Sequence, residues 1–299
     1  MEFPHLYWHS EELGIRADAL VSIFAIEREF HARLLLTESA AERQRQYREL
    51  YNEVHRLRQE GATREAVECT DGTRTKLALT FRREIEGKSM LDVGCGEGTF
   101  LREVARLVRH GKLCGIDTSE VCIGRNIEST QRQKDPIEFL LRDVIDFELP
   151  DRFDVVFSHQ VLEHIAPADL PAHIRSVHAA LKPAGKFIVI LPNRFWGPQD
   201  ITRIVDNTFT GRVPAMGSHV NESSYTELTP WLKLHGFTNI KTIWPLATHI
   251  PFLRSVRVRP VINGMLERNA MLRSLSNLVR WHGRPVFKNS IVLICERRS

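Results

Sequence analysis

The chain has 299 residues, of which 42% are hydrophobic and 26% are charged, and its formal net charge is +4. These proportions are ordinary for a globular protein, and they exclude wholesale disorder, collagen-like repeats and a small disulfide-stapled scaffold. The length favours one large domain with additions, or two modest domains.

Residues 1–87 predict a helical region. Apolar residues recur at helical spacing between positions 23 and 34. Ser39 followed by Glu42 forms a capping-box pattern for a second helix, which Gly61 ends, and a third helix is expected over 73–85. We expect residues 1–87 to form a helical cap over the substrate side of a cleft.

From residue 88 onwards, short apolar runs alternate with helical stretches, which favours a largely parallel sheet. The interpretation is an α/β fold over 88–299 with a doubly wound, mostly parallel, seven-stranded sheet, whose sixth strand runs parallel to the first five. Helices are predicted over 99–109, 119–129, 169–181 and 223–235. Strands are predicted over 89–93, 112–117, 137–142, 153–158, 186–191, 240–244 and 290–295.

The segment Leu91–Phe100 combines a short apolar strand, a DxGxGxG turn and the start of a helix. Glycines at alternate positions let the backbone turn tightly and let a ligand approach it closely. The helix start leaves backbone N–H groups unpaired. In a doubly wound sheet, such a turn binds nucleotide-like ligands at the carboxyl ends of the strands.

Three acidic residues narrow the choice of ligand. A nicotinamide dinucleotide site prefers GxGxxG, whereas this turn reads GxGxG, and Asp92 would repel a pyrophosphate but attract an ammonium group. Asp117 suits the two hydroxyls of a ribose, and Asp143 suits an adenine amino group. Together these contacts describe S-adenosylmethionine. Alternatively, Asp92 caps local N–H groups and Asp117 caps the following helix.

Residues 90–195 resemble a class I S-adenosylmethionine-dependent methyltransferase of the small-molecule, glycan-pathway or ubiquinone-pathway O-methyltransferase kind. The motifs that carry the resemblance are Leu91–Phe100, Gly115–Asp117, Arg142–Val144, Phe153–Ser158 with Val161–His164, and Leu181–Lys186. The resemblance implies a methyltransferase domain over 88–299 that moves a methyl group to a hydroxyl or amine of a small-molecule, sugar or lipid-linked acceptor. The cofactor-binding residues that we expect are Asp92, Gly94, Cys95, Gly96, Gly98, Asp117, Thr118, Asp143, Val144, Ser158 and His159.

Two histidines are candidates for catalysis. His219 lies in a loop ahead of the last predicted helix of the alternating region, and a pKa of about 6.5 suits proton removal at neutral pH. His159 follows the fourth strand, near the expected methyl group. Alternatively, His219 only caps or packs its loop, and His159 belongs to a loop that only closes over the cofactor. Glu163 and His164 are interpreted as structural.

No metal requirement is expected. The HxxxH pair of His5 and His9 has no third ligand in sight, and both are expected to lie in a solvated or loosely packed terminus. The five cysteines are odd in number and lack CxxC spacing, so we expect reduced thiols.

The positive charge is concentrated at the C-terminal end, where residues 251–299 hold ten Lys and Arg against two Asp and Glu. Residues 247–288 separate the last two strands and are expected to form an insert at the active face, with basic amphipathic character over 251–284. Such a segment can contact an anionic membrane surface, although it can also form a lid, a dimer contact or a phosphate-binding rim, or simply pack on the protein.

No apolar run approaches the roughly 18 residues that span a membrane, and Met1–Ser10 lacks the pattern of a secretory signal. A cytoplasmic protein with at most peripheral membrane contact is therefore expected. Alternative functions are an RNA methyltransferase or a non-catalytic scaffold. Ser158–Val161 stands where enzymes that methylate the amino groups of bases carry Asn/Asp-Pro-Pro-aromatic, which argues against nucleic acid. The acceptor and the oligomeric state stay open.

Overall fold

The computed structural model describes residues 2–63, 72–133, 136–243, 255–278, 280–281, 284–285 and 290–298. Parts of the expected insert, including 247–254, lie outside the described residues, as do Trp244 and Cys69. The four cysteines within these ranges are free and buried.

A central sheet of eight strands organises the molecule, in the order β3-β2-β1-β4-β5-β10-β6-β7. The strands are β1 (Met90–Val93), β2 (Leu113–Asp117), β3 (Ile137–Leu141), β4 (Phe153–His159), β5 (Leu181–Leu191), β6 (Phe237–Ile243), β7 (Arg257–Val258) and β10 (Ile291–Arg297). Strands β1 to β5 are parallel, and β10 is antiparallel to both of its neighbours, β5 and β6. Strand β6 therefore runs parallel to β5, and the predicted mostly parallel α/β fold is confirmed.

The predicted number of seven strands is wrong by one. The additional strand, β7, has two residues and pairs antiparallel with Thr242 and Ile243 at the edge of β6. It lies inside the expected insert. A two-residue strand is too short to produce an alternating pattern, so the sequence carries no signal for it.

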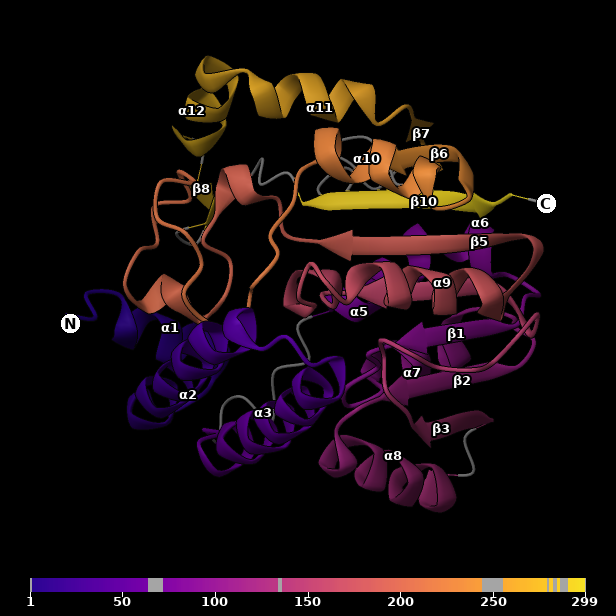
Figure 1. Ribbon diagram of the computed structural model, residues 1–299, viewed down its shortest axis with the longest axis horizontal. Helices are drawn as coiled ribbons and strands as arrows, with labels where there is room; N and C mark the ends of the chain where they lie inside the picture. Colours follow the sequence, from indigo (N-terminus) through magenta and orange to yellow (C-terminus); the bar gives the residue numbers. More distant parts are fainter. Residues whose placement is uncertain are drawn as a thin grey trace.

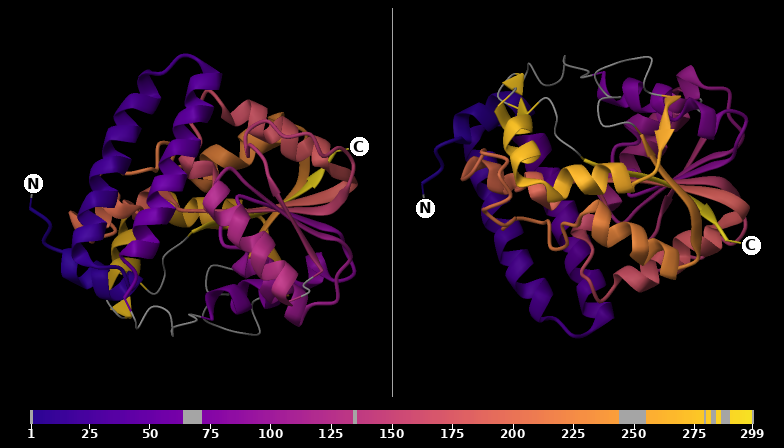
Figure 2. Two further views of the ribbon diagram at one scale, coloured as in Figure 1. Left: turned by 90° about the horizontal axis from the view of Figure 1, so that it is seen from below. Right: turned by 90° about the horizontal axis from the view of Figure 1, so that it is seen from above.

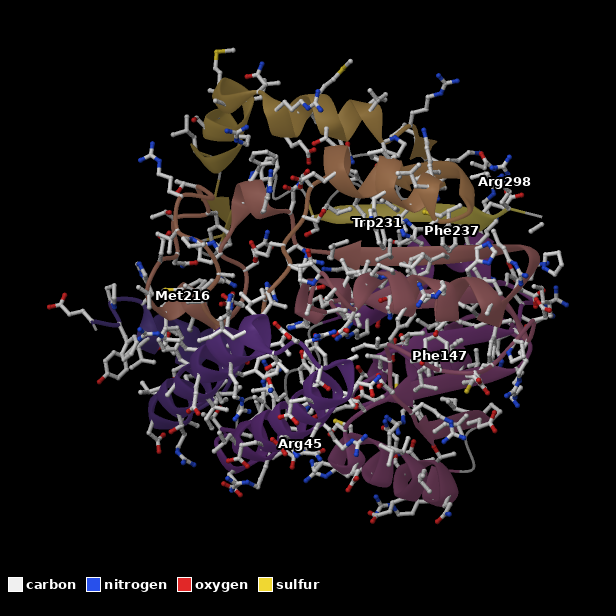
Figure 3. All side chains as sticks on the ribbon, in the orientation of Figure 1. Arg45, Phe147, Met216, Trp231, Phe237 and Arg298 are labelled. Atoms are coloured by element: carbon white, nitrogen blue, oxygen red, sulfur yellow. The ribbon has the colours of Figure 1, made fainter. Side chains whose placement is uncertain are left out.

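Helices cover both faces of the sheet, as Figure 2 shows. One face packs against α9 (Leu170–Ala180) and α10 (Tyr225–Leu234), and its core includes Phe147 and Phe237, which are labelled in Figure 3. The opposite core contains residues of α5 (Thr73–Thr80), α7 (Thr99–Leu107) and α8 (Glu120–Gln133). The third predicted helix is interrupted at Phe81, and α6 (Arg82–Ile85) follows.

The N-terminal helices lie at the end of the sheet toward which the parallel strands point (Figure 1). They are α1 (Leu6–Leu13), α2 (Ala17–Leu36) and α3 (Ala40–Glu60). The Ser39 side chain accepts a hydrogen bond from the backbone N–H of Glu42, as the capping box predicts. Apolar residues of α2 and α3 share a core with Val161 and Ile165, which follow β4.

A buried ion pair ties this helical layer to the sheet domain. Arg43 of α3 donates from Nε to Asp169 Oδ2 at 2.7 Å, directly before α9, and both side chains are almost fully buried. The expectation that His9 lies in a solvated or loosely packed terminus is wrong. His9 is 2% exposed, and its Nδ1 lies 2.8 Å from Glu12 Oε2. Helix α1 has a poorly marked sequence signal, so its packing could not be predicted from periodicity.

The insert forms α11 (Val261–Arg268), α12 (Ala270–Leu278) and the short strands β8 (Arg280–Trp281) and β9 (Arg284–Pro285). Helices α11 and α12 form the outermost layer beyond α10 (Figure 1). The 3-10 helices η1 (Leu162–His164), η2 (Arg194–Trp196) and η3 (Ile201–Ile204) lie in the connections after β4 and β5. Within the described ranges, no helix combines the length and the hydropathy that crossing a membrane requires.

Candidate functional site

The polar residues of the predicted site meet at the carboxyl ends of β1, β2 and β4. Strand β1 lies between β2 and β4 and is parallel to both. The next strand in the chain after β2 lies on the far side of β2, whereas β4 lies on the other side of β1. This reversal of strand order opens a crevice at the sheet edge, which is where doubly wound sheets bind ligands.

The three glycines of the turn differ in the space that a Cβ atom would find at each position. All adopt positive φ angles, of 74° at Gly94, 49° at Gly96 and 68° at Gly98. A Cβ atom on Gly94 would lie 2.5 Å from Val161, and one on Gly98 would lie 2.6 Å from the Phe139 ring. A Cβ on Gly96 would meet no atom of the described residues within 4 Å. Gly94 and Gly98 are therefore needed for packing, whereas Gly96 leaves an open cradle over the turn.

Asp92 lies beside this cradle and is buried, with 4% of the residue exposed. Within the described residues its carboxylate accepts no hydrogen bond. Burial raises its pKa to about 7; the Arg74 cation opposes this rise and Asp117 adds to it. An uncompensated buried charge is costly, so the position suits a cationic group of a ligand.

Asp117 holds the turn from the end of β2. Its Oδ2 accepts from the Gly96 N–H at 2.8 Å and its Oδ1 accepts from the Ser119 N–H at 2.9 Å, and burial raises its pKa. Ser119 itself accepts from the Cys122 N–H at the start of α8. The capping of α8 therefore involves Ser119, and Asp117 keeps lone pairs for a ligand. The neighbouring Thr118 is 9% exposed.

The other predicted contacts surround the same edge. Asp143 is half-buried, and its Oδ1 accepts from the Ile145 N–H at 2.7 Å, while the Val144 carbonyl accepts from His173. Ser158 is fully buried, and its hydroxyl has no partner among the described residues. Burial raises the pKa of the Cys95 thiol well above its usual range, which makes this thiol inert.

His159 does not have the properties of a general base. Its Nδ1 lies 2.5 Å from Arg74 Nη1, so the ring nitrogen accepts from the guanidinium. Burial and the nearby Arg74 charge lower its pKa to about 3. The lone pair that would remove a proton is already engaged, and we therefore assign His159 to the wall of the site and not to proton removal.

His219 lies instead in a cluster with Glu163 and His164. One candidate ligand atom from each of the three lies within 4.8 Å of the others. Two histidines and a carboxylate are a donor set that divalent metal ions accept, a set that the sequence interpretation overlooked because His219 is far away in the chain. The expectation that no metal is required stays a prediction.

The electrostatics of this cluster favour a proton on His219, while burial and the His219 charge lower the pKa of His164 well below its usual value. Burial lowers the pKa of His219, but the hydrogen bond to Glu222 at 2.9 Å and the charges of Asp200 and Glu163 raise it to about 9 overall. Glu163 is fully buried, both of its carboxylate oxygens lack a partner within the described part of the chain, and burial raises its pKa to about 7. His219 therefore holds its proton at neutral pH, whereas Glu163, with a pKa near neutrality, is ionised in only part of the molecules at pH 7.

Sequence reasoning missed three further residues of the site. Tyr51 of α3 has a buried hydroxyl, and its ring meets the His164 ring edge-on with the ring centroids 5.9 Å apart. Asn126 of α8 donates to the Gly96 carbonyl at 2.7 Å. Arg74 comes from α5. All three lie on helices, where a polar side chain that faces the sheet looks like an ordinary surface position in the sequence.

Comparison with known proteins gives consistent results. Residues 42–242 match the family model of the methyltransferase domain. The chain is 30% identical over 158 residues to a ubiquinone biosynthesis O-methyltransferase of Rhodopseudomonas palustris (strain HaA2), covering 53% of this chain and 60% of the relative. It is 26% identical over 157 residues to a carboxy-S-adenosyl-L-methionine synthase of Wolinella succinogenes, covering 52% of this chain and 62% of the relative.

These matches cover less than two thirds of the length of the curated relatives. Among solved structures, a chain from the complex between the Haloferax volcanii Trm112 methyltransferase activator and a methyltransferase has a TM-score of 0.52 at 19% identity. The match covers 79% of this chain and 93% of that chain, and it shows a shared fold.

Proposed function

Because the chain belongs to the methyltransferase domain family, we propose that it transfers the methyl group of S-adenosyl-L-methionine to an oxygen of a small-molecule acceptor. The observation that carries the proposal is the buried Asp92 carboxylate, which accepts no hydrogen bond within the described residues, beside the open cradle at Gly96. The donor set fits the cofactor: Asp92 for its ammonium group, Asp117 for its ribose hydroxyls, and Asp143 for its adenine amino group. When bound, the cofactor supplies a methyl group that is already activated on a positively charged sulfur.

The protein's own contribution is positioning. Val161 packs against Gly94 of the turn, and η1 follows it directly with Glu163 and His164. We call Glu163, His164 and His219 the acceptor cluster, and the short segment from Val161 to His164 links it to the turn, which supports the proposal. Holding two reactants in line can contribute about 7–11 kcal/mol to lowering a barrier. Apolar residues of α2 and α3 share a core with Val161 and Ile165, which supports a role for these helices in covering the acceptor.

Glu163 is the residue that we assign to the acceptor hydroxyl. Its two buried oxygens have no partner among the described residues, so they can accept the hydroxyl hydrogen and then the proton. The protonated His219, held by Glu222, would stabilise the negative charge that develops at the acceptor oxygen. This assignment departs from the expectation that His219 is the base, because the surrounding carboxylates keep its proton on.

The relatives named for ubiquinone biosynthesis support oxygen as the accepting atom and an apolar acceptor. An amine, a sugar and a lipid-linked intermediate stay within the same proposal, since the cluster recognises the reacting atom and not the rest of the acceptor.

The amphipathic insert supports peripheral contact with a membrane. Met265 on α11 is 67% exposed, and on α12 Met271, Leu275 and Leu278 are 67%, 51% and 77% exposed. Exposed apolar residues that gather on one part of the surface mark interaction sites. We call the exposed apolar residues Met265, Met271, Leu275 and Leu278 the apolar rim. We propose that the rim inserts shallowly between lipids, where an acceptor with a hydrocarbon chain would be found.

The function is tested by incubating the full-length protein with isotope-labelled S-adenosyl-L-methionine and metabolite extracts, and identifying the labelled product. Calorimetry with the cofactor alone should show binding that the double variant Asp92→Ala/Asp117→Ala loses while staying folded. Absence of cofactor binding to the unmodified protein would favour the non-catalytic scaffold. Labelled RNA in place of a labelled metabolite would favour the alternative enzyme class.

A further inference from the structure

A second polar feature lies away from the cofactor site. An open groove of about 820 Å³ runs between α10, α11 and the start of β6. Four cations line it: Lys233 of α10, Lys241 of β6, Arg259 just before α11, and Arg268 at the end of α11. No carboxylate is among the lining residues. We call this feature the basic groove.

The four cations are left without counter-charges. Within the described parts of the chain, none of them forms an ion pair with a carboxylate. Some arginines elsewhere do form ion pairs: Arg56 lies 2.7 Å from Glu60, Arg106 lies 2.8 Å from Glu103, and Arg257 lies 2.8 Å from Glu84. The basic groove is thus a local concentration of uncompensated positive charge, which attracts anions.

The only acid of residues 247–288 is kept away from this surface. Glu267 is fully buried, and its carboxylate accepts from the backbone N–H groups of Tyr225 and Thr226 at 3.0 and 2.8 Å and from the Asn193 side chain at 2.7 Å. It therefore stabilises the start of α10 and fastens α11 to it. The contact of Glu267 with the start of α10 forms one side of the groove, and it also keeps the Glu267 carboxylate away from the groove cations.

The groove also has apolar walls next to the apolar rim. Val261 and Met265 line it and are 56% and 67% exposed, and Ile240 lines it from β6. Thr229, which also lines it, has a buried hydroxyl without a partner in the described residues. Cations, a spare hydroxyl and apolar walls together match a ligand with a phosphate at one end and hydrocarbon at the other.

We propose that the basic groove binds the phosphate-bearing headgroup of an anionic phospholipid, with the apolar rim of α11 and α12 inserted beside it. The inference rests on the proposed membrane contact and names the kind of lipid that is bound. Insertion of the apolar rim holds the protein on the membrane, and the cations of the basic groove favour anionic lipid. Each Lys or Arg near an anionic surface contributes about fivefold in affinity.

The test is sedimentation of the full-length protein with vesicles, without cofactor or acceptor. Vesicles of phosphatidylcholine alone are compared with vesicles that also contain phosphatidylglycerol. We expect clear preference for the anionic vesicles, and a loss of about 25-fold in their affinity for Lys233→Gln/Arg268→Gln. The matched control is Lys88→Gln/Arg132→Gln, which removes two exposed positive charges at other places in the fold, on the loop before β1 and on α8. It should bind like the unmodified protein.

Further arms separate the possible occupants. Met265→Ser/Leu275→Ser should weaken binding to both kinds of vesicle, since it tests the rim. Equal binding by the two charge variants would overturn the proposal, because it would reflect net charge alone. Tight binding of free glycerol phosphate without vesicle binding would point to a soluble ligand and overturn the lipid assignment. A dimer in light scattering that Met265→Ser disrupts would show that a second copy covers this face.

The outcomes are independent of methyl transfer. If the protein binds S-adenosyl-L-methionine in calorimetry but does not bind anionic vesicles, the proposed function stands and the lipid proposal is refuted. A protein that binds anionic vesicles through the groove but not the cofactor would have the opposite result.

Discussion

Replacing Asp92 with asparagine removes a buried negative charge from the carboxyl end of β1 while keeping the shape of the side chain. In the ligand-free protein, burial raises the pKa of Asp92 from 3.8 to about 7. A cationic ligand needs the ionised form. About a tenth of the Asp92 side chains are ionised at pH 6 and half at pH 7, so the affinity for S-adenosyl-L-methionine should rise about fivefold over this range.

The same charge affects stability with the opposite sign. The folded protein binds the Asp92 proton more tightly than the unfolded chain does, so the free energy of unfolding falls as the pH rises from about 4 to about 7. At 1.36 kcal/mol per pH unit, the full effect is up to about 4 kcal/mol above pH 7. Asp92→Asn escapes this cost, so the ligand-free variant should be more stable than the unmodified protein at pH 7, and the difference should shrink toward pH 5.

Two measurements check this reasoning. Titration calorimetry at pH 6 and pH 7, at constant ionic strength, gives the cofactor affinity, and urea unfolding without cofactor gives the stability. The variant should bind about tenfold or more weakly at pH 7, the scale of a lost hydrogen bond to a charged group, and should show no fivefold rise. An unmodified protein whose affinity is flat between pH 6 and pH 7, or a variant that keeps the slope, would refute the role of Asp92.

The other predictions concern the turn, the helical cap and the acceptor cluster. Gly94→Ala should lower the thermal midpoint of unfolding more than Gly96→Ala does. Both variants carry about 1–2 kcal/mol of positive-φ strain, but only the Cβ of the first also clashes, with Val161. Gly96→Ala should instead weaken cofactor binding in calorimetry, and a larger loss of thermal stability for Gly96→Ala than for Gly94→Ala would contradict the open cradle. Asp169→Asn should lower the free energy of unfolding in urea by about 3–5 kcal/mol, since it leaves the buried Arg43 without its counter-charge. A change as small as that of Asp18→Asn, in an exposed pair, would show that the N-terminal helices are held by other contacts. Glu163→Gln should lower the turnover of the labelled acceptor by about 10²–10⁴-fold with cofactor affinity nearly unchanged, and full activity would remove Glu163 from proton transfer.

Local patterns were sufficient for much of the fold. The strand-turn-helix unit at Leu91–Phe100, the alternation of short apolar runs with helices, and the capping box at Ser39 depend on contacts within a few residues, which a sequence displays directly. The positions of Asp92 and Asp117 could also be predicted, because they end successive strands, and the ends of neighbouring parallel strands lie side by side. That these residues bind the cofactor stays a prediction.

The acceptor cluster could not be predicted in that way. Glu163 and His219 are separated by more than fifty residues, and their proximity depends on how the loop after η3 folds back over η1. The raised pKa of His219 depends on Asp200, Glu163 and Glu222, which come from distant parts of the chain. A sequence shows only a loop histidine with an ordinary pKa, and the part of His219 in proton transfer stays a prediction.

The sequence by itself determined the sheet-forming segments, the glycine turn and the identity of the acids at the strand ends, because these depend on local periodicity and backbone freedom. Only the tertiary structure decided which charges are left without partners. Among the described residues, Asp92 accepts no hydrogen bond where the sheet buries it, and the cations of the basic groove form no ion pair, while Glu267 is turned inward to the start of α10. Desolvation and pairing depend on everything that packs around a group, and that information exists only in the folded molecule.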